Sequence, residues 1–241
     1  MKLFKNHLIA LLAIFSLAFI NTSCFGDDDN GNNPEYFVEF VTVNASSDGL
    51  GWFENGGLKY YPAGLPTSIE LKKYVGNRAY ITYSIANQTM PGFDKVISLA
   101  ALNIAITEFG VQYVSTQEEY EALGKEPLSI EKMNTHLDSQ WLDLIVSYYY
   151  DKEVQTKFSL VAPDPNLLPE GFAVPDGYLY LELHQKSEKE FLKVNRVESL
   201  VSFKLDDAHN PEVQGYKGIY LKVDNGSLNP VYITIDKVAK Q

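Results

Sequence analysis

The second half of the chain alternates between apolar and polar positions. Four segments share this pattern, and their apolar positions are Leu179, Leu181 and Leu183, then Val201, Phe203 and Leu205, then Ile219, Leu221 and Val223, and finally Val231, Ile233 and Ile235. A period of two is typical of a strand that buries one face. The turn residues Asp224–Ser227 separate the last two segments. The pattern predicts an antiparallel β-sandwich.

The first half is also predicted to be rich in strands. Tyr36–Val43 and Arg78–Ile85 alternate in the same way. Residues Asn55–Gly57 (Asn-Gly-Gly) interrupt two apolar runs, and Asn-Gly at such a place favours a tight hairpin, because the turn needs positive φ. The apolar run Phe93–Phe109 is interpreted mainly as strand, with a helix around Leu99–Ala105 as the alternative.

One short helix is expected between the two halves. Thr116 is followed three positions later by Glu119, which fits a capping box. Gly124 stands where a helix C-cap belongs, and Pro127 lies just beyond it. We therefore expect a short helix there and place the boundary between two domains near it.

The first 23 residues have the layout of a secretory signal peptide. Lys2 and Lys5 make the start positive, and the apolar run Leu8–Ile20 follows. As a helix this run is about 20 Å long, which is too short for a bilayer core of about 30 Å. We therefore expect cleavage after Ser23 rather than a helix that spans a membrane.

Cys24 is the only cysteine, and the small residues Thr22 and Ser23 precede it. This arrangement resembles a lipobox, where bacterial lipoproteins are lipidated and cleaved, although Asn21 stands where that pattern usually has Leu. One cysteine cannot form an intrachain disulfide, so a lone cysteine in an exported chain favours a covalent modification of its thiol. We expect lipid on Cys24 to hold the chain to a membrane. The alternative is ordinary signal cleavage that leaves a free thiol.

Residues 24–34 are predicted to be a flexible acidic tether. Gly, Asn, Asp and Pro dominate this stretch, so it cannot form a core. The acids Asp27, Asp28 and Asp29 resemble the surface-export signal of lipoproteins in some double-membraned bacteria, and a solvated linker is the alternative. We expect a lipid-anchored protein of the bacterial outer membrane, exposed at the surface if these acids act as that signal.

The charge balance disfavours nucleic acid as a partner. The chain has 20 basic and 31 acidic side chains, a net charge of −11. Removing residues 1–23 takes away Lys2 and Lys5 and no acid, so 18 bases remain against 31 acids and the net charge falls to −13. Nucleic-acid binding depends largely on Lys and Arg that neutralise phosphates. We therefore expect no nucleic-acid partner.

Several motifs, taken together and in this order, resemble the NigD-like lipoproteins. They are SCFGDDD, GLKYYP, RAYITYSI, KEPLSIEKM, QWLDLIVSYYY, YLYLELH and VSFKLDD. The resemblance covers most of the mature chain and implies an N-terminal OB-like barrel followed by a C-terminal β-sandwich. The family was first tied to a bacteriocin locus and given an immunity role without a defined biochemical activity, so no catalytic residue is carried over. The Pro-rich loop Pro163–Pro175 is longer than is usual in the family.

Pattern and resemblance together predict an all-β protein with one short helix. The expected segments are a signal peptide at 1–23, a tether at 24–34, an OB-like barrel at 35–113, a linker with the helix at 114–124 and a β-sandwich at 125–241.

The sequence offers no motif for catalysis, for a cofactor or for a metal. His136, His184 and His209 are the histidines after residue 23, and no H-E-x-x-H helix holds them. His184 lies on a strand face opposite leucines, where a surface or half-buried role is expected. His209 lies in a turn-like stretch, where a metal site is the alternative to a plain turn. Because Cys24 is assigned to the anchor, no thiol nucleophile remains. We expect a protein that is not an enzyme and has no cofactor.

Clusters of aromatic residues are the remaining lead to a ligand. Tyr148, Tyr149 and Tyr150 are consecutive, so a strand must turn at least one ring away from the others. Trp52 lies in a second cluster. Exposed rings can stack on sugars or anchor a protein, whereas rings in a core only pack. These four side chains are the candidate ligand contacts.

Two functions remain. The first is a lipid-tethered module that binds a protein or peptide, as a bacteriocin-immunity protein would. The alternative is a surface module that binds glycans through exposed tyrosines. An acidic body would attract a cationic bacteriocin, and that binding would depend on salt.

Overall fold

The computed structural model describes residues 34–65, 70–138, 140–205 and 211–238. The predicted signal peptide, lipidation site Cys24 and acids Asp27–Asp29 lie outside the described residues, as does His209. No helix within the described part is both long and apolar enough to cross a bilayer. Strands dominate, and α1 (Gln117–Glu121) is the one α-helix that the described part contains, which confirms the predicted all-β class with one short helix.

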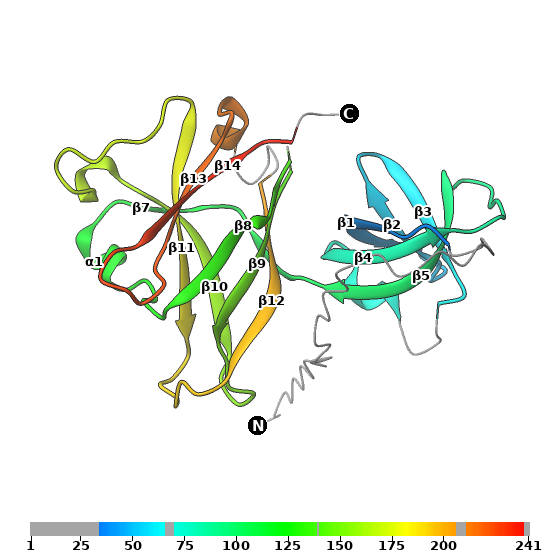
Figure 1. Cartoon of the computed structure of the whole chain (residues 1–241), viewed down its shortest axis with the longest axis horizontal. Coiled ribbons are helices and arrows are strands. Elements are labelled where there is room, and N and C mark those ends of the chain that lie inside the picture. Colours follow the sequence, from blue (N-terminus) through cyan, green and yellow to red (C-terminus); the bar gives the residue numbers. More distant parts are fainter. Residues whose placement is uncertain (1–33, 66–69, 139, 206–210, 239–241) are drawn as a thin grey trace, which may run out of the picture. The chain divides into compact units, whose positions relative to one another are not determined.

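The first part is a closed five-stranded barrel (Figure 1). Its strands are β1 (Phe37–Ala45), β2 (Gly51–Asn55), β3 (Leu58–Ala63), β4 (Arg78–Ile85) and β5 (Lys95–Ile104), with a 3-10 turn, η1, at Leu71–Tyr74. The strand order around the barrel is β1-β2-β3-β5-β4, and β3 pairs with β5 in parallel. A closed five-stranded barrel is the OB-like architecture that the resemblance implies.

Most of the local predictions for the barrel agree with its structure. The expected hairpin joins β2 to β3, but its two turn residues are Gly56 and Gly57, at φ of 58° and 87°, whereas Asn55 of the expected Asn-Gly turn is the last residue of β2. Both values lie in the region that glycine adopts at little cost. The run Phe93–Phe109 contains strands and no helix. Alternate residues point into the core, where Val41, Phe53, Ile81, Tyr83 and Ile97 are buried.

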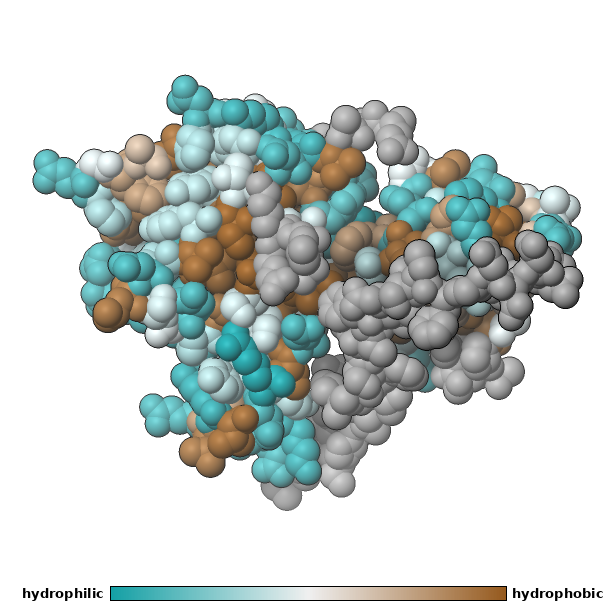
Figure 2. All heavy atoms as spheres, viewed as in Figure 1, coloured by the Kyte–Doolittle hydropathy of each residue, from teal (hydrophilic) through white to brown (hydrophobic). Residues whose placement is uncertain are grey.

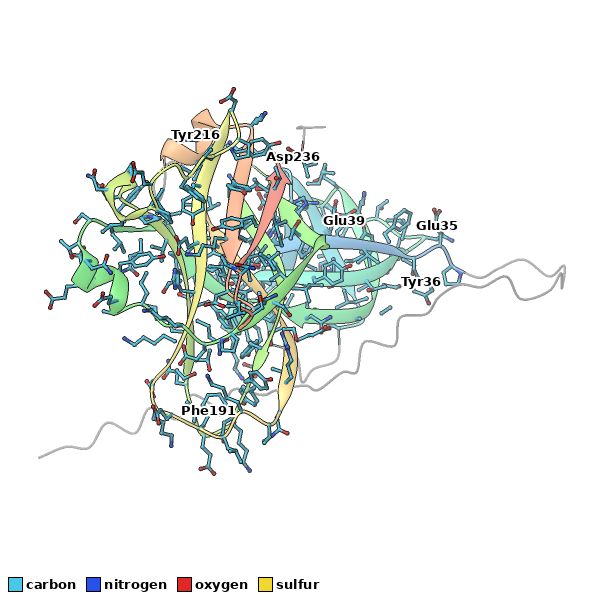
Figure 3. All side chains as sticks on the ribbon, turned by 60° about the vertical axis from the view of Figure 1, so that its left-hand side comes forward. Glu35, Tyr36, Glu39, Phe191, Tyr216 and Asp236 are labelled. Atoms are coloured by element: carbon cyan, nitrogen blue, oxygen red, sulfur yellow. The ribbon has the colours of Figure 1, made fainter. Side chains whose placement is uncertain are left out.

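The second part consists of two sheets packed face to face. Its strands are β6 (Ile106–Phe109), β7 (Gln112–Val114), β8 (Leu128–Leu137), β9 (Trp141–Tyr149), β10 (Thr156–Pro163), β11 (Tyr178–Ser187), β12 (Arg196–Lys204), β13 (Gly218–Val223) and β14 (Val231–Asp236), and η2 (Pro165–Leu167) and η3 (Pro211–Gly215) are 3-10 turns. One sheet has the order β14-β13-β11-β10-β7, and the other has the order β6-β12-β9-β8. Figure 3 shows Tyr216 and Asp236 at one end of these sheets and Phe191, in the β11–β12 loop, at the other.

The core of this part forms from the apolar positions that alternate in the sequence. Leu181, Leu183, Val201, Phe203 and Leu205 are all buried. They join Ile219, Leu221, Val223, Ile233 and Ile235 in one cluster between the sheets, and Leu179 packs partly buried against it. Full burial of one such side chain contributes about 1.5–3 kcal/mol, so this cluster is the main stabilising feature of the two sheets. Val231, which the alternation also placed in the core, is 39% exposed at the start of β14.

The barrel ends with β5 at Ile104, before residue 113, where we expected its end. The two short strands that follow belong to the second part. β6 pairs in parallel with β12, and β7 pairs in parallel with β10, so each lies at the edge of a different sheet of the second part. Gly110, at φ 71°, lies between them and lets the chain turn from one sheet to the other. β11 and β13 also pair in parallel, so the sheets are mixed rather than purely antiparallel.

One buried ion pair links the barrel to the second part. Arg78, on β4, is 2% exposed, and Asp143, on β9, is fully buried. The Arg78 Nε lies 3.3 and 3.2 Å from the two Asp143 carboxylate oxygens, and the Ser202 hydroxyl donates to the same carboxylate at 2.6 Å. A second arginine nitrogen donates to Asp138 at 3.3 Å. Both charges are therefore compensated inside the protein.

Candidate functional site

The three consecutive tyrosines do not form one exposed cluster. Tyr148 is 3% exposed, its ring lies edge-on to Phe158 with centroids 5.0 Å apart, and its side chain is in the core. Tyr148 therefore cannot serve as the surface contact we expected, because β9 turns it inward. Tyr150 packs partly against the same core. Tyr149 points to the opposite face, where the Arg196 guanidinium lies 5.7 Å from its ring centre.

Trp52 lies on β2 of the barrel, whereas the tyrosines of β9 belong to the second part. It is half-buried, with Phe93 edge-on to it at 6.2 Å and the Lys59 ammonium 5.9 Å from its ring centre. Trp52 thus belongs to the barrel, whereas Tyr148 and Tyr149 lie on β9 of the four-stranded sheet and Tyr150 directly follows β9. The structure does not bring them together as one site.

The strongest candidate site lies on the face of the five-stranded sheet that points away from the core. We call this surface the outer face. Strands β10, β11, β13 and β14 alternate, so each side chain next to a core residue lies on it. Its main residues are Lys157, Ser159, Tyr180, Glu182, His184, Lys186, Tyr220, Lys222 and Tyr232.

A buried carboxylate, that of Glu182, is the centre of this face. Glu182 is 1% exposed and accepts hydrogen bonds from the hydroxyls of Tyr180, at 2.7 Å, and Tyr120, at 2.8 Å. The Lys222 ammonium lies 3.1 Å from it. Burial raises the pKa of Glu182, but hydrogen bonds from His184 and Tyr180 and the charge of Lys222 outweigh burial and hold this pKa at about 2. Glu182 is therefore an anion at neutral pH.

His184 connects this carboxylate to residues 115–126, which include α1 and which we call the α1 segment. Its Nε2 lies 3.0 Å from the Glu182 carboxylate, and its Nδ1 lies 2.9 Å from the backbone oxygen of Gly124. Both partners are acceptors, so only the doubly protonated ring satisfies both contacts, whereas a neutral ring satisfies one. The imidazole thus ties the end of the α1 segment to β11.

The α1 segment is fixed over the outer face by its own local sequence. The predicted capping box is present: Thr116 Oγ1 accepts from the Glu119 backbone nitrogen, and the Glu119 carboxylate accepts from that of Thr116. The C-cap is Ala122, not Gly124 as expected. A Cβ on Gly124 would lie 1.8 Å from the Gln185 backbone oxygen, so this glycine allows the chain to pass directly against β11.

Aromatic rings continue the outer face toward β14. Tyr220 and Tyr232 stack with centroids 5.3 Å apart and planes at 18°. Phe172, from the long Pro-rich loop, packs on Tyr180 at 4.8 Å. Tyr232 is 39% exposed, so its ring is available to a partner. Figure 2 shows apolar side chains in brown gathered in several patches on the side in view, bordered by hydrophilic ones, and tyrosines are not among the brown residues on this scale.

Two adjoining pockets open beside the α1 segment. The larger, of about 270 Å³, is lined by residues that include Lys157, Ser159 and Lys186. The smaller, of about 110 Å³, is lined by Tyr120, Glu182 and Lys222 among others. His184 and Gly124 line both. Within the described residues, no group of three or more His, Cys, Asp or Glu side chains is arranged to hold a metal.

Sequence reasoning missed this site, although part of its signal was present. The segment Tyr178–His184 alternates aromatic, acidic and histidine side chains with leucines. The cover by Tyr120, 62 residues earlier than Glu182, could not be inferred from local pattern.

Comparisons with known proteins identify the architecture. No family model matches the chain, and no curated protein matches it. A solved structure of a protein of unknown function from Bacteroides vulgatus is 19% identical, with a TM-score of 0.66, covering 85% of this chain and 92% of that one. A structure from Bacteroides fragilis, described as a "Putative lipoprotein", is 14% identical with a TM-score of 0.55, covering 84% and 97%.

The third structure is that of a NigD-like immunity protein from Bacteroides caccae. It is 15% identical with a TM-score of 0.53, and the match covers 85% of this chain and 93% of that one. TM-scores above 0.5 over most of both chains show a shared fold, and at identities this low they show the fold alone. The chain therefore has the fold of a NigD-like immunity protein, which confirms the architecture that its motifs imply.

Proposed function

We propose that this chain is a lipid-anchored envelope protein that binds a protein or peptide partner through the outer face. The observation that carries the proposal is the joint presence, on that face, of a buried charged cluster at Glu182, two pockets and the exposed ring of Tyr232. Binding sites commonly combine apolar rings with a few fixed polar groups. An immunity-like role is supported by the fold shared with the NigD-like immunity protein.

The anchor is lipid on Cys24, in the outer membrane. The signal-like start, the lone cysteine and the acidic stretch after it support this assignment. A protein described as a "Putative lipoprotein" also shares the fold. Several acyl chains hold firmly, since each buried CH₂ contributes about 0.8 kcal/mol.

Replacing Cys24 by alanine is expected to release the protein from membranes. The wild-type chain should sediment with the outer membrane and show acyl chains on residue 24 by mass spectrometry. The Cys24→Ala variant should lack both properties. An unmodified thiol at residue 24 in the membrane-bound wild-type chain would contradict the anchor.

A glycan-binding role is the second candidate, favoured by the stacked pair Tyr220 and Tyr232. Flat aromatic surfaces can stack on sugar rings, and such contacts do not depend on charge. Binding of a neutral sugar should therefore survive high salt, whereas capture of a cationic peptide by an acidic protein should weaken. This difference separates the two candidates.

The double variant Tyr220→Ala with Tyr232→Ala is expected to lose binding, while Tyr149→Ala, on the other sheet, should keep it. A strain lacking the gene should become more sensitive to a bacteriocin in a panel from related strains. Wild-type and Tyr149→Ala chains should restore resistance, and the double variant should not. Salt-resistant binding on a glycan array, lost in the double variant, would replace the first candidate by the second. If neither assay responds to the double variant, the outer face is not the binding surface.

A further inference from the structure

Two lysines face each other directly on the outer face. The register of β10 and β11 places Lys157 opposite Lys186 and Ser159 opposite His184. Like charges opposite each other on adjacent strands are destabilising. This arrangement is costly in the protein alone, and a bound anion would relieve it.

The larger pocket lies at this pair. Its lining includes Lys157, Ser159, His184 and Lys186, so three side chains that carry or can carry positive charge meet at a cavity of about 270 Å³. Two of them are already held in place: the Lys186 ammonium donates to the Ala122 backbone oxygen at 2.9 Å, and the ring of His184 contacts Gly124 and Glu182. The positive groups are therefore partly preorganised, which lowers the cost of binding.

The acids near this pocket have other contacts. Glu119 lines it, but its Oε2 accepts from the backbone nitrogens of Ser115 and Thr116, each at 3.1 Å. Burial raises the pKa of Glu108, and the positive charge of Lys157 lowers the same pKa by a smaller amount. Lys157 and Lys186 thus remain the two positive groups at this pocket, in a protein with a net charge of −11.

We propose that this pocket binds an oxyanion, a carboxylate or phosphate group of the partner, between Lys157 and Lys186. The Ser159 hydroxyl supplies a further donor. Charge-assisted hydrogen bonds from ammonium groups to such anions are stronger than neutral ones. The inference rests on the proposed function and deepens it by naming one anionic group that the partner presents, which a peptide that is cationic overall also carries as its C-terminal carboxylate.

The test is calorimetric titration of the full-length lipidated protein in detergent at low salt, with glucuronate, inorganic phosphate and neutral glucose as probes. Glucuronate and phosphate should bind and glucose should not, and raising the salt from about 20 to about 300 mM should weaken both. Binding of glucuronate alone identifies a carboxylate as the preferred source of the anion, and binding of phosphate alone identifies a phosphate.

Lys157→Gln and Lys186→Gln should each weaken anion binding about tenfold or more, because each removes one charged donor. Lys72→Gln, at an exposed position of η1, is the matched control and should change nothing. Lys157→Gln leaves the hydrogen bond between Lys186 and Ala122 in place. If Lys186→Gln disturbs the α1 segment, the Lys157→Gln variant alone therefore tests the oxyanion site.

The inference is overturned if neither glucuronate nor phosphate binds, or if Lys72→Gln weakens anion binding as much as the two lysine variants of the pocket do. The tyrosine variants test the proposed function separately. If partner binding depends on Tyr220 and Tyr232 while neither anion binds, only the oxyanion site is rejected. If the anions bind but the tyrosine variants behave as wild type in both partner assays, only the proposed function is rejected.

Discussion

Replacing Arg78 by alanine is expected to lower the free energy of unfolding by about 3–5 kcal/mol, because it leaves a buried carboxylate without its partner. Asp143 is fully buried, and after the substitution only the Ser202 hydroxyl would still donate to it among the contacts described above. The Arg78 side chain also contacts Asp138, and its guanidinium lies 5.3 Å from the Trp141 ring centre. Chemical denaturation followed by circular dichroism measures the loss.

The loss should shrink as the pH falls. Burial raises the pKa of Asp143, and Arg78 opposes that rise. Without Arg78 the folded-state pKa lies further above the unfolded value, so the unpaired charge destabilises the variant at high pH and protonation removes that penalty at low pH.

Two further variants make the Arg78 prediction specific. The double variant Arg78→Met with Asp143→Leu removes both charges and should recover most of the stability. Arg196→Ala removes an exposed arginine that hydrogen-bonds Ser147 and Ser129 on neighbouring strands, and should cost less than about 1 kcal/mol. Equal losses for Arg78→Ala and Arg196→Ala would show that the buried pair has no special role.

Phe203→Asp is expected to prevent the second part from folding. Phe203 is fully buried in the core between the two sheets. Truncating a buried phenylalanine costs about 3–5 kcal/mol, and a buried unpaired charge adds several more. The sum is comparable to the whole stability of a typical domain, about 5–15 kcal/mol. Size-exclusion chromatography and near-ultraviolet circular dichroism should show aggregated or unfolded protein.

The matched control for this prediction is Phe109→Asp. Phe109 lies on β6, opposite Lys204 of β12, and is 62% exposed. Exposed substitutions usually change stability by about 0.5 kcal/mol or less, so this variant should fold. A folded, cooperative Phe203→Asp protein would refute the assignment of this residue to the core.

Local signals in the sequence were sufficient for most of the fold. The alternation at Val201, Phe203 and Leu205 identified core positions, because a half-buried strand has a period of two. The capping box at Thr116 and the hairpin glycines at Gly56 and Gly57 are likewise fixed by a few neighbouring residues. These features need no knowledge of distant contacts.

Contacts between distant segments could not be predicted. Alternation requires Tyr148 and Tyr149 to face opposite sides, but which side is buried depends on the sheet that packs against β9. The pair Arg78 and Asp143 is 65 residues apart, and neither residue carries a local sign of its partner. The outer face was missed for the same reason, since Tyr120 reaches Glu182 from a different segment.

The placement of β6 and β7 determines where the chain can be cut for the study of isolated fragments. β6 covers one edge of the four-stranded sheet, next to β12, and β7 covers one edge of the five-stranded sheet, next to β10. A fragment that starts at residue 125 would leave the backbone of both edge strands open, and open edges recruit other chains into intermolecular sheets. A recombinant second part should therefore begin before Ile106, so that its own first residues shield it from self-association.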